Sequence, residues 1–226
     1  MSRSVVAIAA VALLASPALA EDRNFNLSGF DKVAVAGSDN VDIRHGSAFR
    51  VVATGPADEL DKLELVAKAG ELKIGRKRQW WRWSGEDVKV SVTMPALHGV
   101  RISGSANVVA DRGDGPAFAM AISGSGDMKI AGVDAAKVGL AISGSGDVTA
   151  AGRCTSVDVQ VSGSGNAMLA GLKCANVDVS VAGSGDVAAH ASTAAMVRVA
   201  GSGDVRITGG GRCTKKVAGS GTVTCS

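Results

Sequence analysis

Two aspartates in the second half of the chain are candidates for acid–base chemistry. Asp158 and Asp178 each lie five residues before a Gly-Ser-Gly motif. If the two motifs stack on each other, the carboxyl groups lie about 5 Å apart, which is the separation found in retaining glycosidases. We expect this pair on a flat face without an obvious cleft, where the neighbouring column holds a single cation, Arg198. A catalytic role for the pair is therefore the less favoured interpretation.

The segment from Gly75 to Gly85 concentrates aromatic and basic side chains. It holds all three tryptophans of the chain together with four cations from Arg76 to Arg82. Indole rings stack on sugars or lie at membrane interfaces, and arginine pairs with phosphate or carboxylate. The segment is a candidate binding loop for an anionic glycan, a lipid headgroup or an envelope polymer. The residues we expect to contact such a ligand are Arg76, Arg78, Trp80, Trp81, Arg82 and Trp83. In the alternative interpretation, the indoles cover the flank or end of the fold while the cations stay in solvent.

Acidic and amide side chains also recur at one position of a repeat: Asn107, Asp127, Asp147, Asn166, Asp186 and Asp204. One such residue in every 18 to 20 is too sparse for the six to eight oxygen ligands of calcium. Asp and Asn also hydrogen-bond the local backbone of turns, and we expect that role here. The three histidines are scattered and no Cys-x-x-Cys spacing is present, so we expect no metal site and no cofactor.

The repeat itself defines the fold that positions these side chains. The pattern Gly-Ser-[Gly/Ala]-[Asp/Asn/Thr] occurs seven times at spacings of 18 to 20 residues. Its first glycines are Gly104, Gly124, Gly144, Gly163, Gly183, Gly201 and Gly219. Apolar residues alternate with polar ones on both sides of each motif, which is typical of strands with one buried face. A unit of this length buries its apolar side only by stacking on its neighbours. The pattern therefore predicts an all-β parallel solenoid, with glycine corners that favour positive φ.

The first 20 residues have the features of a secretory signal peptide. Arg3 precedes an apolar stretch, and Ala18-Leu19-Ala20 resembles a cleavage site. No cysteine follows that site, so we expect no lipid anchor, and no later stretch has 18 consecutive apolar residues. We expect residues 21–226 to form one domain, in which residues 21–100 are irregular and rich in strands and residues 101–226 hold the regular repeats. The mature protein is expected to be exported, to the periplasm or the cell surface.

Composition and charge exclude several classes of protein. Hydrophobic residues make up 46% of the chain, which argues against intrinsic disorder. The formal net charge is +3, and the segment from Arg76 to Arg82 carries four positive charges. Because the basicity is confined to one segment, we do not expect a nucleic-acid-binding face.

Four cysteines in an exported chain suggest two disulfides, for which three connectivities exist. Cys154 and Cys174 each lie nine residues before a motif glycine, so stacking places them on adjacent coils about 4.8 Å apart. That separation suits a disulfide. Cys213 and Cys225 lie six residues before and after Gly219. We predict the pairs Cys154–Cys174 and Cys213–Cys225, the second as a staple across the last coil.

The signal peptide, the strand-rich first half ending in Val92-Thr93-Met94-Pro95-Ala96-Leu97, and the train of Ile-Ser-Gly-Ser-Gly-Asp-Val copies together form a distinctive combination. It resembles the putative auto-transporter adhesin head GIN domain family of bacterial envelope proteins, over about residues 25 to 226. The resemblance implies a right-handed parallel β-helix and supplies no catalytic residues.

Together, these patterns favour a non-enzymatic binding or adhesion module of the cell envelope, with a glycan or another envelope polymer as its ligand. Two alternatives remain open. One is a pectinase-like β-helix enzyme that acts on carbohydrate. The other is a structural protein that associates with itself through exposed strand edges at the solenoid ends. The oligomeric state is left open.

Overall fold

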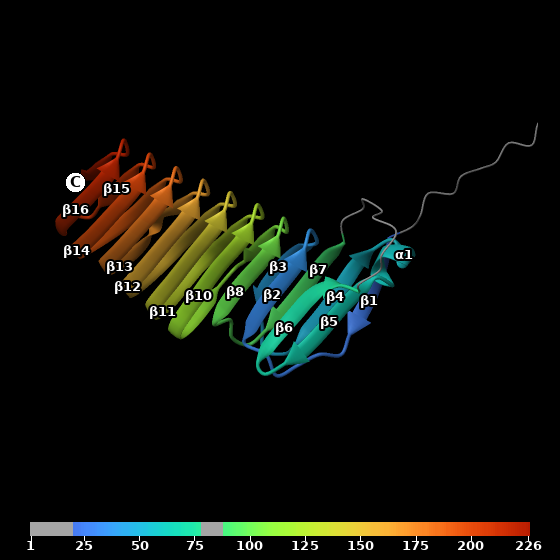
Figure 1. Ribbon diagram of the computed structural model, residues 1–226. Coiled ribbons are helices and arrows are strands. Elements are labelled where there is room, and N and C mark those ends of the chain that lie inside the picture. The colour runs from blue at the N-terminus through green and yellow to red at the C-terminus, as the bar shows by residue number, and fades with distance from the viewer. Residues whose placement is uncertain (1–19, 78–87) are drawn as a thin grey trace, which may run out of the picture.

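Strands dominate the computed structural model, which describes residues 20–77 and 88–226. Within these ranges, one short helix, α1 (Ala57–Leu60), accompanies strands β1 to β17, which belong to one continuous hydrogen-bonded sheet. The sheet winds into an elongated parallel β-solenoid (Figure 1). The predicted fold class is therefore confirmed.

The regular coils occupy the second half of the chain and stack in chain order. Each strand from β8 onward pairs in parallel with strands one coil away. The seven motif glycines pair with one another in register, from Gly104 to Gly219. The strands are β8 (Gly99–Gly104), β9 (Val108–Ala110), β10 (Gly113–Gly124), β11 (Met128–Gly144), β12 (Val148–Gly163), β13 (Ala167–Gly183), β14 (Val187–Gly201), β15 (Val205–Thr208), β16 (Arg212–Gly219) and β17 (Val223–Cys225).

Strand β11 shows how one coil closes around the core. Its buried residues are Met128, Ile130, Val133, Ala135, Val138, Leu140 and Ile142. The alternation of buried and outward residues breaks twice, at 131–132 and at 136–137. Each break is a bend, so the coil has three short faces that surround a column of small aliphatic side chains. The two-residue period predicted from the sequence describes these faces and fails only at the bends.

The corner glycines allow successive coils to approach each other closely. The first glycine of each copy has a φ between +126° and +139°, a range that side chains disfavour. A Cβ on Gly146, the second glycine of its copy, would lie 2.1 Å from the carbonyl oxygen of Gly126 on the preceding coil. In turn, the carbonyl oxygen of Gly124 accepts hydrogen bonds from the backbone N–H groups of Ser145 and Gly146. The corner thus needs glycine both for its conformation and for contact between coils.

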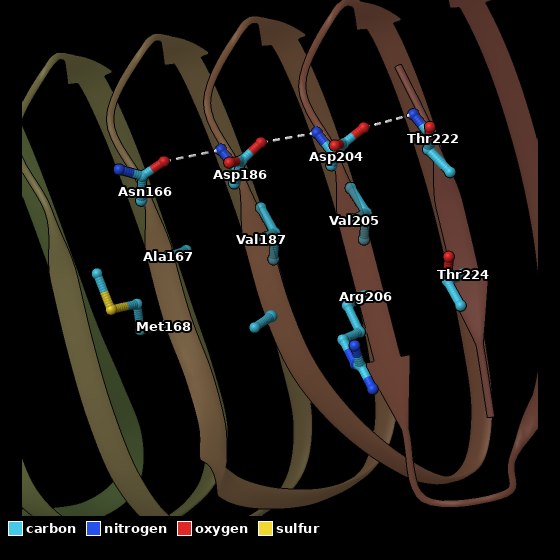
Figure 2. Close-up of a pocket in the computed structure, with 11 residues that line it drawn as sticks. Asn166, Ala167, Met168, Asp186, Val187, Asp204, Val205, Arg206, Thr222 and Thr224 are labelled. Atoms are coloured by element: carbon cyan, nitrogen blue, oxygen red, sulfur yellow. Dashed lines mark hydrogen bonds between the residues drawn. The ribbon is translucent and has the colours of Figure 1, made fainter.

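The side chains of the Asp and Asn column hydrogen-bond to the neighbouring coil instead of to the backbone of their own turn. The side-chain oxygen of Asp127 accepts the backbone N–H of Asp147, and Asp204 accepts that of Thr222. The same bond recurs at each step between them, with donor–acceptor distances of 2.8 to 3.0 Å. Figure 2 shows the last three steps of this ladder. The expected bond to the local backbone is thus replaced by a bond to the backbone N–H group one coil further along the axis.

The N-terminal part continues the same sheets, as expected, but its coils are not stacked in chain order. Parallel pairing places the β2–β3 coil between the β8–β9 coil and the β6–β7 coil. Antiparallel strands close the far end: β5 lies on β6, and β4 lies between β7 and β1. The bounds are β1 (Glu21–Phe25), β2 (Lys32–Gly37), β3 (Asn40–His45), β4 (Arg50–Gly55), β5 (Leu63–Lys68), β6 (Glu71–Arg76) and β7 (Lys89–Met94).

Two disulfides form between the predicted partners. Cys154 and Cys174 lie side by side on β12 and β13, with a Cα–Cα distance of 4.6 Å. Cys213 and Cys225 join β16 to β17 across the last coil, with a Cα–Cα distance of 6.4 Å. Lys215 pairs in register with the buried Val197, and its ammonium group donates a hydrogen bond to the carbonyl oxygen of Val223. A disulfide and a charged side chain therefore close the C-terminal end.

Replacing Gly146 by Ala tests the corner. The new methyl group would collide with a backbone oxygen of the preceding coil, which cannot rotate away. We expect the free energy of unfolding to fall by about 2–3 kcal/mol, as for overpacked sites. Gly139→Ala is the matched control, because its Cβ would meet no atom within 4 Å. That control should change stability by less than about 0.5 kcal/mol. Urea denaturation measures both, and equal effects would contradict the role assigned to the corner.

Replacing Cys213 and Cys225 by Ser tests the staple on the last coil. The bridge closes a loop of 12 residues, so its loss should weaken that coil by about 3 kcal/mol. Because a solenoid repeat contacts only its neighbours, the effect should stay local. Hydrogen exchange should accelerate in β16 and β17 and change little in β11 and β12. Uniformly faster exchange along the whole solenoid would argue against a local staple.

Candidate functional site

Asp158 and Asp178 stack on adjacent coils, in the register that the repeat predicts. They are paired residues of β12 and β13, whose backbones lie about 4.8 Å apart. Each carboxylate accepts a hydrogen bond from a different outward side chain. Gln160 donates to Asp158 at 3.0 Å, and Arg198 donates to Asp178 at 2.9 Å. The pair is thus held in place on an exposed surface.

The face around this pair is not flat, contrary to the expectation from the repeat. A shallow, open groove runs along the solenoid axis across β11, β12, β13, β14 and β16. We call it the axial groove. One side is formed by Lys137, Ser156, Asn176, Ala194 and Arg212, and the other by Asp158, Asp178, Met196 and Thr214. Buried residues such as Val157 and Val177 form the floor of the groove between the two outward columns, next to the bend. Sequence periodicity located the column of Asp158 and Asp178 but did not reveal the groove beside it.

The Cys154–Cys174 disulfide lies beside the axial groove. Each cysteine precedes a lining residue by two positions: Ser156 on β12 and Asn176 on β13. The bridge therefore joins covalently the two coils that carry Asp158 and Asp178. It fixes the separation of these coils where the groove is most polar.

A second groove follows the Asp and Asn ladder near the C-terminal end. Asn166, Asp186 and Asp204 form its rim in Figure 2, and Met168, Arg206 and Thr224 extend outward below them. Because the side chain of Ala188 is small, the space between Met168 and Arg206 stays open. One oxygen of each rim side chain is already engaged with the next coil, so this rim contributes mainly to coil stacking.

Arg76 is the one candidate ligand-binding residue of the Trp- and Arg-rich segment that the structure describes. Its guanidinium bonds Asp39 through two nitrogens and Glu59 through the third. Both carboxylates are 1% exposed. The described geometry thus places Arg76 in a buried ion cluster. The remaining candidates, Arg78, Trp80, Trp81, Arg82 and Trp83, lie outside the described residues, so a ligand-binding role for them stays a prediction.

Asp39 is a residue that sequence reasoning missed. It stands in the irregular copy Gly37-Ser38-Asp39-Asn40, at the position where most later copies have their second glycine. Its side chain accepts the backbone N–H of Val88 at 3.1 Å in addition to the bonds from Arg76. An aspartate in a glycine column is the signal that would have identified it. In the neighbouring β6–β7 coil, 12 residues separate Arg76 from Lys89, whereas three residues separate β10 from β11.

The described residues contain no group of three or more His, Cys, Asp or Glu side chains placed to hold a metal ion. Nor is any helix in the described ranges long and apolar enough to cross a membrane.

Comparison with known proteins agrees with this architecture. Residues 29–211 match the family described as "Putative auto-transporter adhesin, head GIN domain". The chain belongs to this family. The resemblance found in the sequence is therefore confirmed.

Solved structures of the same fold come from species of Bacteroides and Parabacteroides. A putative adhesin from Bacteroides fragilis superposes with a TM-score of 0.87 at 19% identity, covering 92% of this chain and 97% of that one. A putative lipid binding protein from Parabacteroides distasonis has a TM-score of 0.75 at 17% identity, covering 92% and 97%. A putative adhesin from Parabacteroides merdae has a TM-score of 0.73 at 19% identity, covering 92% and 96%. No curated protein matches the chain. At these identities, the likeness establishes the fold alone.

The buried ion cluster makes part of the stability depend on pH. Burial by itself disfavours the charged form of Glu59, but hydrogen bonds from Lys62 and Arg76 outweigh it and hold the pKa of that carboxyl below its usual value. The stabilisation is fully present above the unfolded-state pKa and is lost as the pH falls through the lower folded-state pKa. Glu59→Gln should therefore destabilise the N-terminal end at pH 7, by about 3 kcal/mol, the cost of breaking a buried pair. The difference from wild type should shrink below about pH 4. Thermal unfolding of wild type and Glu59→Gln from pH 3 to 7 measures this difference in stability. A difference that stays constant over that pH range would refute the link between the ion cluster and pH.

Proposed function

We propose that this protein is a non-enzymatic, exported binding module of the adhesion type in the bacterial cell envelope. Its ligand is a glycan or another envelope polymer. The observation that carries this proposal is the axial groove, where equivalent positions recur at the coil spacing across β11, β12, β13, β14 and β16, and every one of these strands except β14 contributes polar side chains. A linear polymer lying along such a groove would meet equivalent positions at every coil.

The oxidation state of the four cysteines supports export. Both pairs of cysteines are oxidised to disulfides, which persist outside the reducing cytoplasm. The signal-peptide features of residues 1–20 agree with this compartment and leave the periplasm and the cell surface as destinations. The structural neighbours named putative adhesin and putative lipid binding protein carry names of the same binding type.

The arrangement of the aspartate pair favours binding over hydrolysis. Asp158 and Asp178 lie in an open groove, and each is already held by its own partner, Gln160 or Arg198. A glycosidase requires one of its two carboxyl groups to stay protonated as the acid, which calls for a water-poor environment. Exposed and hydrogen-bonded carboxylates suit the recognition of sugar hydroxyls better.

The Trp- and Arg-rich segment provides a second candidate contact, which rests on its sequence. In the sequence it connects β6 to β7, which pair with β2 and β3 on either side of the Gly37-Ser38-Asp39 corner. Arg78, Trp80, Trp81, Arg82 and Trp83 are expected there to contact an acidic polymer or a lipid headgroup.

Binding of residues 21–226 to fractionated envelope glycans tests the function. We expect retention on at least one glycan fraction, without the release of new reducing ends during prolonged incubation. The triple variant with Trp80, Trp81 and Trp83 replaced by Ala should stay folded and lose only the binding that depends on that segment. Glycan cleavage by wild type that Asp158→Ala abolishes would instead establish the enzyme alternative. Retention by no fraction would refute the proposed function.

A further inference from the structure

We propose that the axial groove is the ligand-binding site and that its ligand is an uncharged glycan strand lying along the solenoid axis. This inference rests on the proposed function and narrows it to one surface and one class of polymer.

The direction of the groove fits a strand of linked sugars. Its lining residues come from equivalent positions of successive coils, which are about 4.8 Å apart. This step is comparable to the length of one β-linked hexose unit. Neighbouring sugars of an extended strand would therefore meet equivalent positions on neighbouring coils.

The polar lining matches the hydrogen-bonding needs of sugar hydroxyls. Asp158 and Asp178 offer carboxylate oxygens, which only accept hydrogen bonds when ionised. Ser156 and Asn176 lie across the groove from them and both donate and accept. A hydroxyl group also donates and accepts, so each sugar in the middle of the groove can bond to both sides.

The distribution of charge argues for a neutral polymer. Lys137 and Arg212 lie at the two ends of the groove, on β11 and β16, and both carboxylates lie between them. An extended polyanion would place its own acidic groups against Asp158 and Asp178. A polycation would meet Lys137 and Arg212. A neutral strand avoids both repulsions.

Met196 supplies an apolar contact where many sugar sites have an aromatic ring. It continues the column of Asp158 and Asp178, and 43% of its surface is exposed. The guanidinium of Arg198 lies against its sulfur atom and so limits the freedom of the side chain. Opposite it, Ala194 is small enough to leave room for the C–H face of a sugar ring.

The disulfide beside the groove reduces the cost of ordering it. Cys154–Cys174 holds β12 and β13 together two residues from Ser156 and Asn176. Because a site that is rigid before binding loses less entropy when it is occupied, a covalent link at this place favours affinity.

The test compares two double variants of residues 21–226. Asp158→Ala with Asp178→Ala removes the carboxylates of the groove. Asp61→Ala with Asp134→Ala removes two exposed carboxylates elsewhere and produces the same change in net charge. The probes are the neutral hexamers of β-linked glucose and of β-linked N-acetylglucosamine, with polygalacturonate as the acidic comparison. Calorimetry gives the affinity, and amide chemical shifts of Ser156, Asn176 and Ala194 report the location.

We expect wild type to bind a neutral hexamer, with shifts confined to the groove and little change in affinity between 50 and 500 mM salt. The groove variant should bind at least tenfold more weakly, and the control should stay within twofold of wild type. If the groove variant binds as well as wild type does, the groove is not the site, although the proposed function stands. A preference for polygalacturonate that weakens with salt would overturn the neutral ligand class. Binding of no glycan, whether these probes or envelope fractions, would overturn both proposals.

Discussion

The close contact between glycine corners is the constraint on which the rest of the solenoid depends. Each first glycine holds a positive φ, and from Gly104 to Gly201 its carbonyl oxygen accepts hydrogen bonds from N–H groups of the next coil. Neither glycine of a full motif has space for a Cβ. Once the corners are stacked in this way, the register of the coils is fixed, because a shift of one residue would turn every buried side chain outward. The ladder of Asp and Asn side chains then adds one further bond per coil at the same edge.

A coil spacing set by the backbone leaves the outward side chains free to differ. One outward column runs from Gly99 through Ala119, Gly139, Asp158, Asp178 and Met196 to Thr214, so very different side chains occupy the same structural position. The inward column beside it holds mainly Val, since the narrow interior tolerates little else. The residues that fix the fold therefore lie at the corners and in the interior, and the outward columns are free to vary. A groove lined by both polar and apolar side chains can therefore form on a backbone that is nearly the same in every coil.

The repeat made much of the fold predictable, and its limits are also physical. A spacing of 18 to 20 residues from Gly104 to Gly219 determines which residues stack, so the strands, the aspartate pair and both disulfides followed from counting positions relative to the motif glycines. Counting no longer identifies the stacking partners in the N-terminal part, where the spacing of the strands is irregular. Nothing local indicates that the β2–β3 coil lies between β8–β9 and a coil formed later in the chain. Asp39 was missed for the same reason, because its partners Arg76 and Val88 come from segments outside the repeat. The axial groove depends on side-chain volumes around a bend, which periodicity does not encode.

The two ends of the solenoid are closed by different means, and this bears on where a partner can bind. At the N-terminal end, antiparallel strands β4 and β5 cover the last parallel coil, and the Asp39, Glu59 and Arg76 cluster lies beside them. At the C-terminal end, the last coil places Lys215 in an otherwise apolar column and ties β16 to β17 by a disulfide. A second copy that extended the sheet from this end would have to bury or displace the charge of Lys215, which is unfavourable without a partner carboxylate. End-to-end association is therefore the less favoured use of this fold. The long outward faces, and the axial groove among them, are the surfaces left for recognition.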